Sequence, residues 1–294
     1  MTTFDFRSPA SSTADTADTA GDRFVRFVRR LASTAPGLVL SWLVIVTVVL
    51  WAVAPGWFTS FSPYDGDVDA SFSPPGPEHL FGTDRLGRDL LARVIFGAST
   101  TLSATLLAVL VGFVVGSVVG LLSGFVGGRT DAIVMRFVDV LLAIPALLLA
   151  MTVVTALGYG TFNVALAVGI SAVAAFARVM RSEVLKVAQS DYVEAAYGSG
   201  AGFGRVVVRH VLPNSVTAVL SLAALECGSA ILAVAALGFL GYGAPPPEPE
   251  WGLAVSEGRD YLATYPWISI LPGVLIAVVV LATNRISKSL GDQR

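Results

Sequence analysis

Long apolar runs recur along this chain, and they restrict its fold more than any other feature. A helix of about 20 apolar residues crosses the ~30 Å hydrocarbon core of a bilayer. Only 14% of the 294 residues are charged and the mean hydropathy is +0.74, whereas soluble domains carry about 25% charged residues. We therefore expect an all-α, polytopic membrane protein with six transmembrane helices. The predicted helices cover residues 38–54, 102–124, 136–157, 162–178, 216–240 and 267–283.

The distribution of basic residues predicts the orientation of these helices. With the N-terminus in the cytoplasm, fifteen lysines and arginines fall in inside segments, and only Arg85, Arg88, Arg93 and Arg259 fall outside. Loops that stay in the cytoplasm carry the excess of basic residues. We expect a multi-pass protein of the cell (inner) membrane with both termini in the cytoplasm.

A cleaved secretory signal is the alternative interpretation of the first apolar run. Ala52-Val53-Ala54 is similar to a cleavage site, and arginines precede the run. However, the run begins near residue 38, is longer than a signal core, and is followed by Pro55. We favour a retained helix.

The predicted spans divide the chain into four parts. Residues 1–36 form a cytoplasmic tail, 37–97 the first helix and an extracytoplasmic loop, 98–288 a core of five helices, and 289–294 a second tail. Within the first tail, residues 1–20 have a disorder-prone composition. Residues 22–31 have the pattern of a basic amphipathic helix on the headgroup layer, or of a charged leader that fixes orientation; the two are compatible.

The composition excludes several functions. The net charge of −2 gives no indication of nucleic acid as a partner. A single cysteine, Cys227, allows no intrachain disulfide or zinc cluster, and two distant histidines, His79 and His210, do not indicate a metal site. No Gly-Lys-Ser/Thr follows a glycine-rich loop, so this chain is not itself an ATPase. We expect no catalytic residue and no metal ligand.

The longest internal cytoplasmic loop, residues 179–214, has the pattern of a short helix held by a glycine turn. Asp191 and Glu194 form a capping pair for this helix, and Ala195 and Ala196 give it a low-profile surface. Four glycines then turn the chain, and a second short helix begins near Arg205 and stops before Pro213. The glycines are Gly198, Gly200, Gly202 and Gly204. A small helix of this kind can insert into a groove of a soluble partner, although periodicity alone favours an ordinary loop.

The spacing within this loop resembles the EAA signature of ABC importer permeases. That signature is Glu-Ala-Ala, three residues, Gly, nine residues and a stretch ending in Leu-Pro, which matches Glu194 to Ala196, Gly200, and Leu212-Pro213. The wider stretches 191–196 and 209–214 are similar to the C-type subunit of the dipeptide, oligopeptide and nickel branch. The resemblance implies that the loop docks on an ATPase. The residues it implies in coupling are Asp191, Glu194, Ala195, Ala196, Gly200, Arg209, Leu212 and Pro213.

Two further stretches extend the resemblance to about residues 70–284. Residues 82–89 are similar to the family's GTD-x-x-GRD element, and residues 237–252 to its FLG-x-G, proline-rich and Trp-Gly element. The chain departs from the family at Tyr197, Ser199, Ser99 and Val234, and in the tail after Arg285.

The resemblance implies a type I ABC importer permease fold and a function in ATP-driven import of dipeptides or oligopeptides. It implies a second, B-type permease subunit, two ATPase subunits, an extracytoplasmic substrate-binding protein and membrane lipid as partners. It also implies no cofactor in this chain, with ATP and Mg²⁺ on the ATPases. Nickel or another small solute remains an alternative substrate. A secondary transporter is a remote alternative, because no internal repeat is evident.

Glu226 is the only acid deep within a predicted span. Ionisable groups at that depth are costly and mark functional sites by default. It either lines the translocation pathway and meets a substrate ammonium or cation, or is a packing residue.

Three other features bear on packing and on the outer surface. Glycines recur every fourth residue from Gly112 to Gly124, a pattern that lets another helix approach closely. Pro145 and Pro272 are expected to kink their helices. Ten acids in the loops 55–101 and 241–266, against four arginines, predict an anionic outer surface that could meet a binding protein.

Overall fold

The computed structural model describes residues 36–291 of the chain. The expected tail of residues 1–36, with its amphipathic helix, and the last three residues lie almost entirely outside this range. By internal contacts the chain divides into Met1–Val39 and Leu40–Arg294. The first unit contributes only the opening turn of α2 (Pro36–Val53) to the described residues, and the second holds the other helices.

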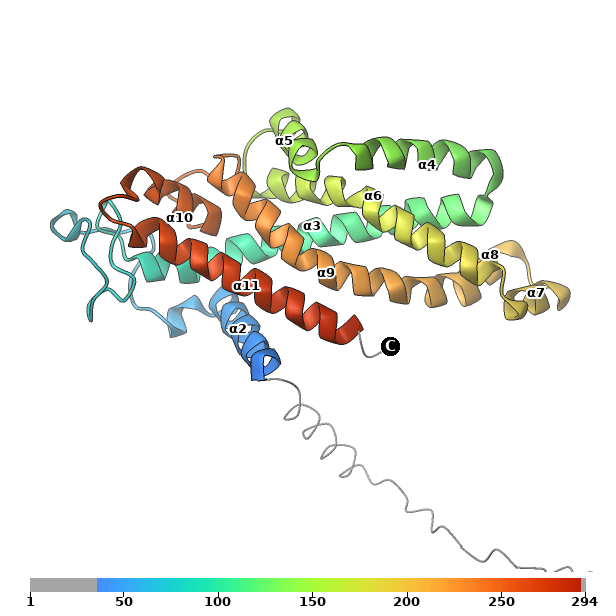
Figure 1. The fold of residues 1–294 in the computed structure, drawn as a ribbon, viewed down its shortest axis with the longest axis horizontal. Helices are drawn as coiled ribbons and strands as arrows, with labels where there is room; N and C mark the ends of the chain where they lie inside the picture. The colour runs from blue at the N-terminus through green and yellow to red at the C-terminus, as the bar shows by residue number, and fades with distance from the viewer. Residues whose placement is uncertain (1–35, 292–294) are drawn as a thin grey trace, which may run out of the picture. The chain divides into compact units, whose positions relative to one another are not determined.

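The described chain is helical, and no strand occurs between residues 36 and 291. The helices after α2 are α3 (Leu90–Val126), α4 (Gly128–Ala143), α5 (Ala146–Leu157), α6 (Thr161–Ala188), α7 (Asp191–Gly198), α8 (Phe203–Val206), the π-helical turn η3 (Val207–Val211), α9 (Leu212–Phe239), α10 (Trp251–Gly258) and α11 (Trp267–Gly291). Short 3₁₀ turns are η1 (Pro55–Trp57), η2 (Val68–Ala70) and η4 (Arg259–Tyr261). Within the Leu40–Arg294 unit, α3, α6 and α9 pack on one another, and α7 and α8 lie at the opposite end from α10 (Figure 1).

The expected set of transmembrane helices is confirmed with one change. Among the described residues, five helices are long and apolar enough to cross a membrane, and α4 with α5 makes a sixth if the pair counts as one span. Several helices extend beyond the predicted spans. Helix α3, the second predicted span, begins at Leu90, and α6 continues to Ala188, well into the stretch expected to be a loop.

The expected continuous helix over 136–157 is wrong, because the chain breaks there. Helices α4 and α5 meet at an angle of 98°. Pro145 has no backbone N–H to donate, and its ring pushes the preceding residue out of the helical region. Ile144 accordingly has an extended conformation, with ψ at 129°. The proline expected to kink a helix therefore ends it, whereas Pro272 lies within α11.

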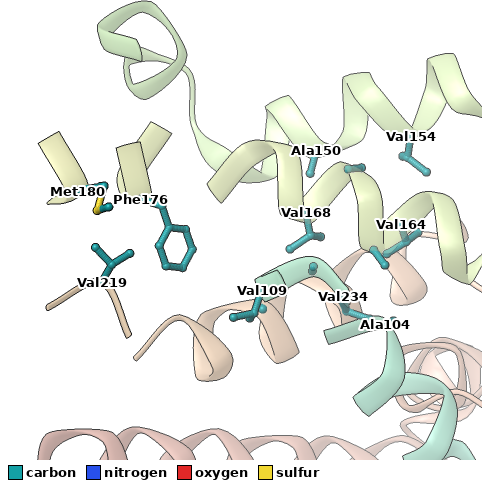
Figure 2. Close-up of a cluster of buried hydrophobic side chains, with 14 of the residues drawn as sticks. Ala104, Val109, Ala150, Val154, Val164, Val168, Phe176, Met180, Val219 and Val234 are labelled. Atoms are coloured by element: carbon teal, nitrogen blue, oxygen red, sulfur yellow. The ribbon is translucent and has the colours of Figure 1, made fainter. Parts of the chain in front are cut away.

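The main core lies between α3, α5, α6 and α9. Val109, Val168 and Phe176 are among its buried side chains, and Figure 2 shows Val168 between α5 and Val109. A second cluster, around Trp251 and Ala98, joins α10 to α2, α3, α9 and α11. These two clusters tie the five long helices together.

The glycines spaced four apart on α3 lie against α6. A Cβ on Gly112 would lie 3.0 Å from the Ala172 Cβ, and one on Gly116 would lie 2.5 Å from the Phe176 Cβ. The distance at Gly116 is closer than real Cβ atoms approach, so a larger residue there would require α3 or α6 to shift, and the contact at Gly112 is tight. The expected helix-packing role of the stripe is therefore met within this chain.

Candidate functional site

Helix α7 is a short surface helix held by a few buried side chains. Val193 on α7, Val206 on α8 and Val211 on η3 are buried and belong to the main core. Phe203 at the start of α8 packs edge-on against Phe125 of α3, with ring centroids 4.5 Å apart. These contacts hold α7 against α6 and α8, and α8 against α3, while the other face of α7 stays exposed.

The expected capping pair at the start of α7 is wrong. Ser190 is the N-cap residue, and Asp191 is already the first helical residue. Ser190 donates its hydroxyl to the carbonyl of Val187 and caps nothing. Asp191 and Glu194 both lie in the first turn, where carboxylates interact favourably with the helix dipole. They are exposed and do not close a reciprocal cap.

The expected glycine turn is present, and it depends on one glycine. Gly200 has φ of +83°, which L-residues rarely adopt. Its N–H donates to the Tyr197 carbonyl at 2.9 Å, and the N–H of Ala201 donates to the Ala196 carbonyl at 3.0 Å. These two bonds form a Schellman motif, which closes the end of the helix.

The other three glycines do not make the turn. Gly198 ends α7, Gly202 is the N-cap residue of α8, and Gly204 lies within α8. None of the three has a positive φ.

The expected end of the second short helix before Pro213 is wrong, because α8, η3 and α9 form one helical path from Phe203 to Phe239. Pro213 cannot donate a backbone hydrogen bond, and it is the second residue of α9. The π-helical turn immediately before it accommodates the change in hydrogen bonding. Asn214 donates its side-chain amide to the carbonyl of His210 at 2.6 Å. The helical turns of α8 and η3 are thus continuous with a membrane helix.

The structure brings the predicted coupling residues to the α7 end of the bundle with most of them accessible. Two are partly buried, namely Ala196 and Leu212. The exposed ones are Asp191, Glu194, Ala195, Gly200, Arg209 and Pro213. Tyr192 and Tyr197 add exposed aromatic surface on α7. This arrangement can be covered by a partner without disturbing the buried valines.

Glu226 lies apart from this segment, on the wall of a cavity that is partly open to the surface. The cavity has a volume of about 200 Å³ and is lined by residues of α3, α4, α5, α6 and α9. Most of the lining is small and apolar, and Glu226, Ser171 and Ser229 are its polar members. A half-buried carboxylate in such a wall can interact with a positively charged group.

At the α10 end, an ion-pair network was not foreseen from the sequence. Arg88 donates its Nε to Asp84 Oδ2 at 2.6 Å, and Arg93 donates its Nη2 to Glu257 Oε2 at 2.9 Å. Arg93 also donates to the carbonyls of Pro63 and Pro247. The GTD-x-x-GRD element is therefore a structural unit that holds the long loop after α2 against α10.

Glu250 completes this end of the molecule. Its carboxylate accepts hydrogen bonds from the N–H groups of Gly252 and Leu253 at 2.8 and 2.7 Å, and so caps α10. Burial raises the pKa of the Glu250 carboxyl above its usual value. The indole N–H of Trp251 donates to the carbonyl of Val94 on α3 at 2.9 Å.

The expected anionic outer surface carries fewer acids than predicted, because some of them are buried. Asp84, Asp89 and Glu250 are buried and hydrogen-bonded, and so are not on the surface. The acids that are exposed are Asp65, Asp67, Asp69, Glu78, Glu248 and Asp260, against the exposed Arg85 and Arg259. The surface is still anionic, with fewer charges than the sequence count gave. In the sequence, the indication of this buried pair is that Asp84 and Arg88 are four residues apart.

Comparison with known proteins places these features in one family. The family model for "Binding-protein-dependent transport system inner membrane component" matches residues 116–292. A probable D,D-dipeptide transport system permease protein of Escherichia coli (strain K12) is 38% identical over 258 residues, which are 88% of this chain and 87% of the relative. A dipeptide transport system permease protein of Alkalihalophilus pseudofirmus is 36% identical, covering 86% and 84%. A glutathione transport system permease protein of Shigella flexneri is 39% identical, covering 85% and 83%.

Solved structures agree at the level of the fold. A chain of the MetNI methionine ABC transporter, in an inward-facing conformation, matches with a TM-score of 0.53 at 21% identity, over 68% of this chain and 95% of that one. A chain of an amino acid ABC transporter solved with histidines matches with a TM-score of 0.54 at 16% identity, over 69% and 95%. The expected all-α permease fold is thereby confirmed.

Proposed function

We propose that this chain, which belongs to the family of binding-protein-dependent transport system inner membrane components, carries dipeptides or oligopeptides across the membrane. It is a multi-pass permease subunit of an ABC importer, a translocation component and not an enzyme. The observation that carries the peptide assignment is the similarity to permeases named for D,D-dipeptides, dipeptides and glutathione, over 85% or more of the chain. Glutathione is itself a small peptide.

The α7 segment is the part of this chain that docks on an ATPase. Its exposed face is short, carries two carboxylates and two tyrosines, and is backed by buried valines. A rigid helix with one free face suits insertion into a groove of a soluble subunit. ATP and Mg²⁺ then belong to two partner ATPases, and their closure moves α7 and, through η3, α9.

A second permease subunit covers the break between α4 and α5. Ile144, Leu147 and Leu148 around the break are exposed. Non-helical backbone at membrane depth is not tolerated against lipid, because its polar groups find no partners there. Coverage by another permease chain, with the pathway between the two, satisfies these groups.

The α10 end faces outward and receives a substrate-binding protein, and the α7 end and both termini face the cytoplasm. The basic residues near α7 and their scarcity near α10 support this orientation. The six exposed acids at the α10 end provide the docking surface. Glu226 lies on the pathway between the two ends, at the cavity.

Co-purification followed by reconstitution tests the proposal. The chain is expressed with its candidate partners, and the complex in liposomes is given ATP inside and radiolabelled dipeptides or Ni²⁺ outside. Peptide uptake that requires ATP and the binding protein is the expected result. Uptake of Ni²⁺ or of another small solute, with no uptake of peptide, would overturn the peptide assignment.

A further inference from the structure

The cavity beside Glu226 is lined by small apolar residues, one carboxylate and two hydroxyl groups, a composition that favours a small positively charged group. Its lining of small apolar residues, such as Ala108 on α3 and Ala172 on α6, carries one ionisable side chain, Glu226. The hydroxyls of Ser171 and Ser229 are also in the wall. Ser171 donates to the carbonyl of Val168, which leaves its oxygen able to accept.

Within residues 36–291, Glu226 has no basic partner. The ion pairs of α3, α4 and α6 join other residues, namely Arg93 with Asp84 and Glu257, Arg178 with Asp139, Arg181 with Asp131, and Lys186 with Glu183. A carboxylate removed from water without a partner is costly unless a cation joins it. A positively charged ligand would give this partly buried carboxylate the partner that it lacks among the described residues.

A primary ammonium fits this wall better than a metal ion does. Metal ions such as Ca²⁺ take six to eight oxygen ligands and Mg²⁺ demands near-ideal octahedral geometry, and no group of three or more His, Cys, Asp or Glu suitable for a metal ion occurs in the described residues. An ammonium group has three donors, which one carboxylate and two hydroxyls can satisfy.

The size of the cavity limits how much of a ligand it holds. Its volume of about 200 Å³ is below the roughly 300–1,000 Å³ of pockets that enclose a whole small molecule. It can hold one end of a peptide, with the remainder extending away along the pathway.

From these observations we infer that Glu226, with Ser171 and Ser229, binds the amino-terminal ammonium group of a peptide during its passage. The inference rests on the proposed function as a peptide permease. It makes Glu226 a specificity-determining residue that favours peptides with a free amino terminus.

Transport by the reconstituted complex tests this inference with three probes: dialanine, N-acetyl-dialanine, and N-acetyl-alanyl-lysine, whose only ammonium is on a side chain. Uptake is compared for the wild type, Glu226→Gln and Glu226→Asp, always with the same binding protein, so that its own preference cancels in the ratios. Glu183→Gln removes a carboxylate that pairs with Lys186 outside the cavity, and serves as the control.

We expect Glu226→Gln to lower dialanine uptake about tenfold, because a hydrogen bond to a charged group is stronger than one to a neutral amide. N-acetyl-dialanine uptake stays unchanged, and Glu226→Asp keeps most of the preference for the free amine. Equal effects of Glu226→Gln on all probes, or no effect, would overturn the inference and indicate a packing residue. Loss confined to the lysine peptide would overturn it in favour of a side-chain site. A wild-type complex that imports no peptide would instead refute the proposed function.

A second measurement does not need the binding protein. A hydrophobic carbodiimide activates carboxyl groups, and a bound free amine then forms an amide with the activated one, releasing the urea. Mass spectrometry of the treated complex is expected to find dialanine attached at Glu226, and its absence there, with attachment at other carboxylates, would contradict the inference. N-acetyl-dialanine has no amine and cannot form an amide with the Glu226 carboxyl group.

Discussion

Arg93 and Glu257, 164 residues apart in the chain, are joined by a 2.9 Å hydrogen bond between Nη2 and Oε2. Arg93 is almost completely buried, so its charge depends on Glu257, on Asp84 and on two loop carbonyls. Removing one member of a buried pair leaves the other charge uncompensated. This side chain therefore links α3, α10 and the long loop after α2.

Arg93→Met is expected to destabilise the protein by about 3–5 kcal/mol. Thermal unfolding of the detergent-solubilised complex measures the loss. Arg259→Met is the control, because Arg259 and its partner Asp260 are both exposed and surface changes cost about 0.5 kcal/mol or less. If both variants unfold alike, the buried network does not stabilise this end of the molecule.

Gly200→Ala is expected to weaken the turn after α7, since an L-residue at φ +83° costs about 1–2 kcal/mol. Gly202→Ala is the matched control, because Gly202 has φ of −72° and no neighbour within 4 Å of an added Cβ. The variants are compared by the ratio of peptide imported to ATP hydrolysed. A lower ratio in Gly200→Ala alone is the expected result, and equal ratios would remove the turn from coupling.

Glu194→Arg changes the exposed face of α7 without touching its buried valine. We expect normal insertion into the membrane, with ATP hydrolysis that no longer responds to substrate and binding protein. ATPase activity in liposomes, with and without peptide, measures this response. Full retention of ATPase stimulation by peptide would show that the ATPase does not depend on the exposed face of α7.

Gly116→Ala is expected to destabilise the α3–α6 contact by about 1–3 kcal/mol, because the new methyl group would overpack against Phe176. Gly273→Ala is the control, since a Cβ there meets nothing within 4 Å and alanine favours the helix by about 1 kcal/mol. Both are measured by thermal unfolding. An unchanged or higher midpoint for Gly116→Ala would mean that the helices can separate without cost.

Glu250 gives a pH dependence of stability whose sign can be stated. Its pKa is raised by burial, so the folded protein binds more protons than the unfolded chain between about pH 4.3 and the raised value. The contribution of Glu250 to stability therefore falls as pH rises through that window. The difference in unfolding temperature between wild type and Glu250→Gln is expected to decline over this range. A difference independent of pH would contradict it.

The proposed orientation is tested by single cysteines in a Cys227→Ser background. Thr2→Cys and Arg294→Cys are expected to resist an impermeant thiol reagent in intact cells, while Asp65→Cys, exposed in the loop after α2, is expected to react. Labelling of either terminus in intact cells would reverse the topology.

The sequence predicted what depends on hydrophobicity and local turn chemistry. The apolar runs gave the helices, the glycine spacing gave the contact between α3 and α6, and the pattern around Gly200 gave the turn after α7. Helix ends were less predictable, because α3 begins directly after its N-cap Asp89 and α6 continues to Ala188, both beyond the apolar runs on which the prediction was based. The pairing of Arg93 with Glu257 was beyond local reasoning, since it depends on how distant segments pack.

The Pro145 break and the path through Pro213 show the same limit. Both prolines follow a helix-forming stretch. Helix α4 ends before Pro145, whereas Pro213 lies in the first turn of α9. The outcome depends on whether the preceding residue is pushed into an extended conformation, as Ile144 is, or whether a π-helical turn takes up the missing bond.

The unbroken helical path from Phe203 to Phe239 has a consequence for exchanging parts between transporters. Each residue of an α-helix advances 1.5 Å and rotates about 100°, so inserting or deleting one residue between Pro213 and Glu226 would turn the carboxylate away from the cavity. Chimeras that take their docking segment from another permease should therefore be joined before Phe203, in the glycine-rich stretch, where the helical phase has not yet been set. Chimeras joined after Phe203 must keep the number of residues between the junction and Glu226 unchanged.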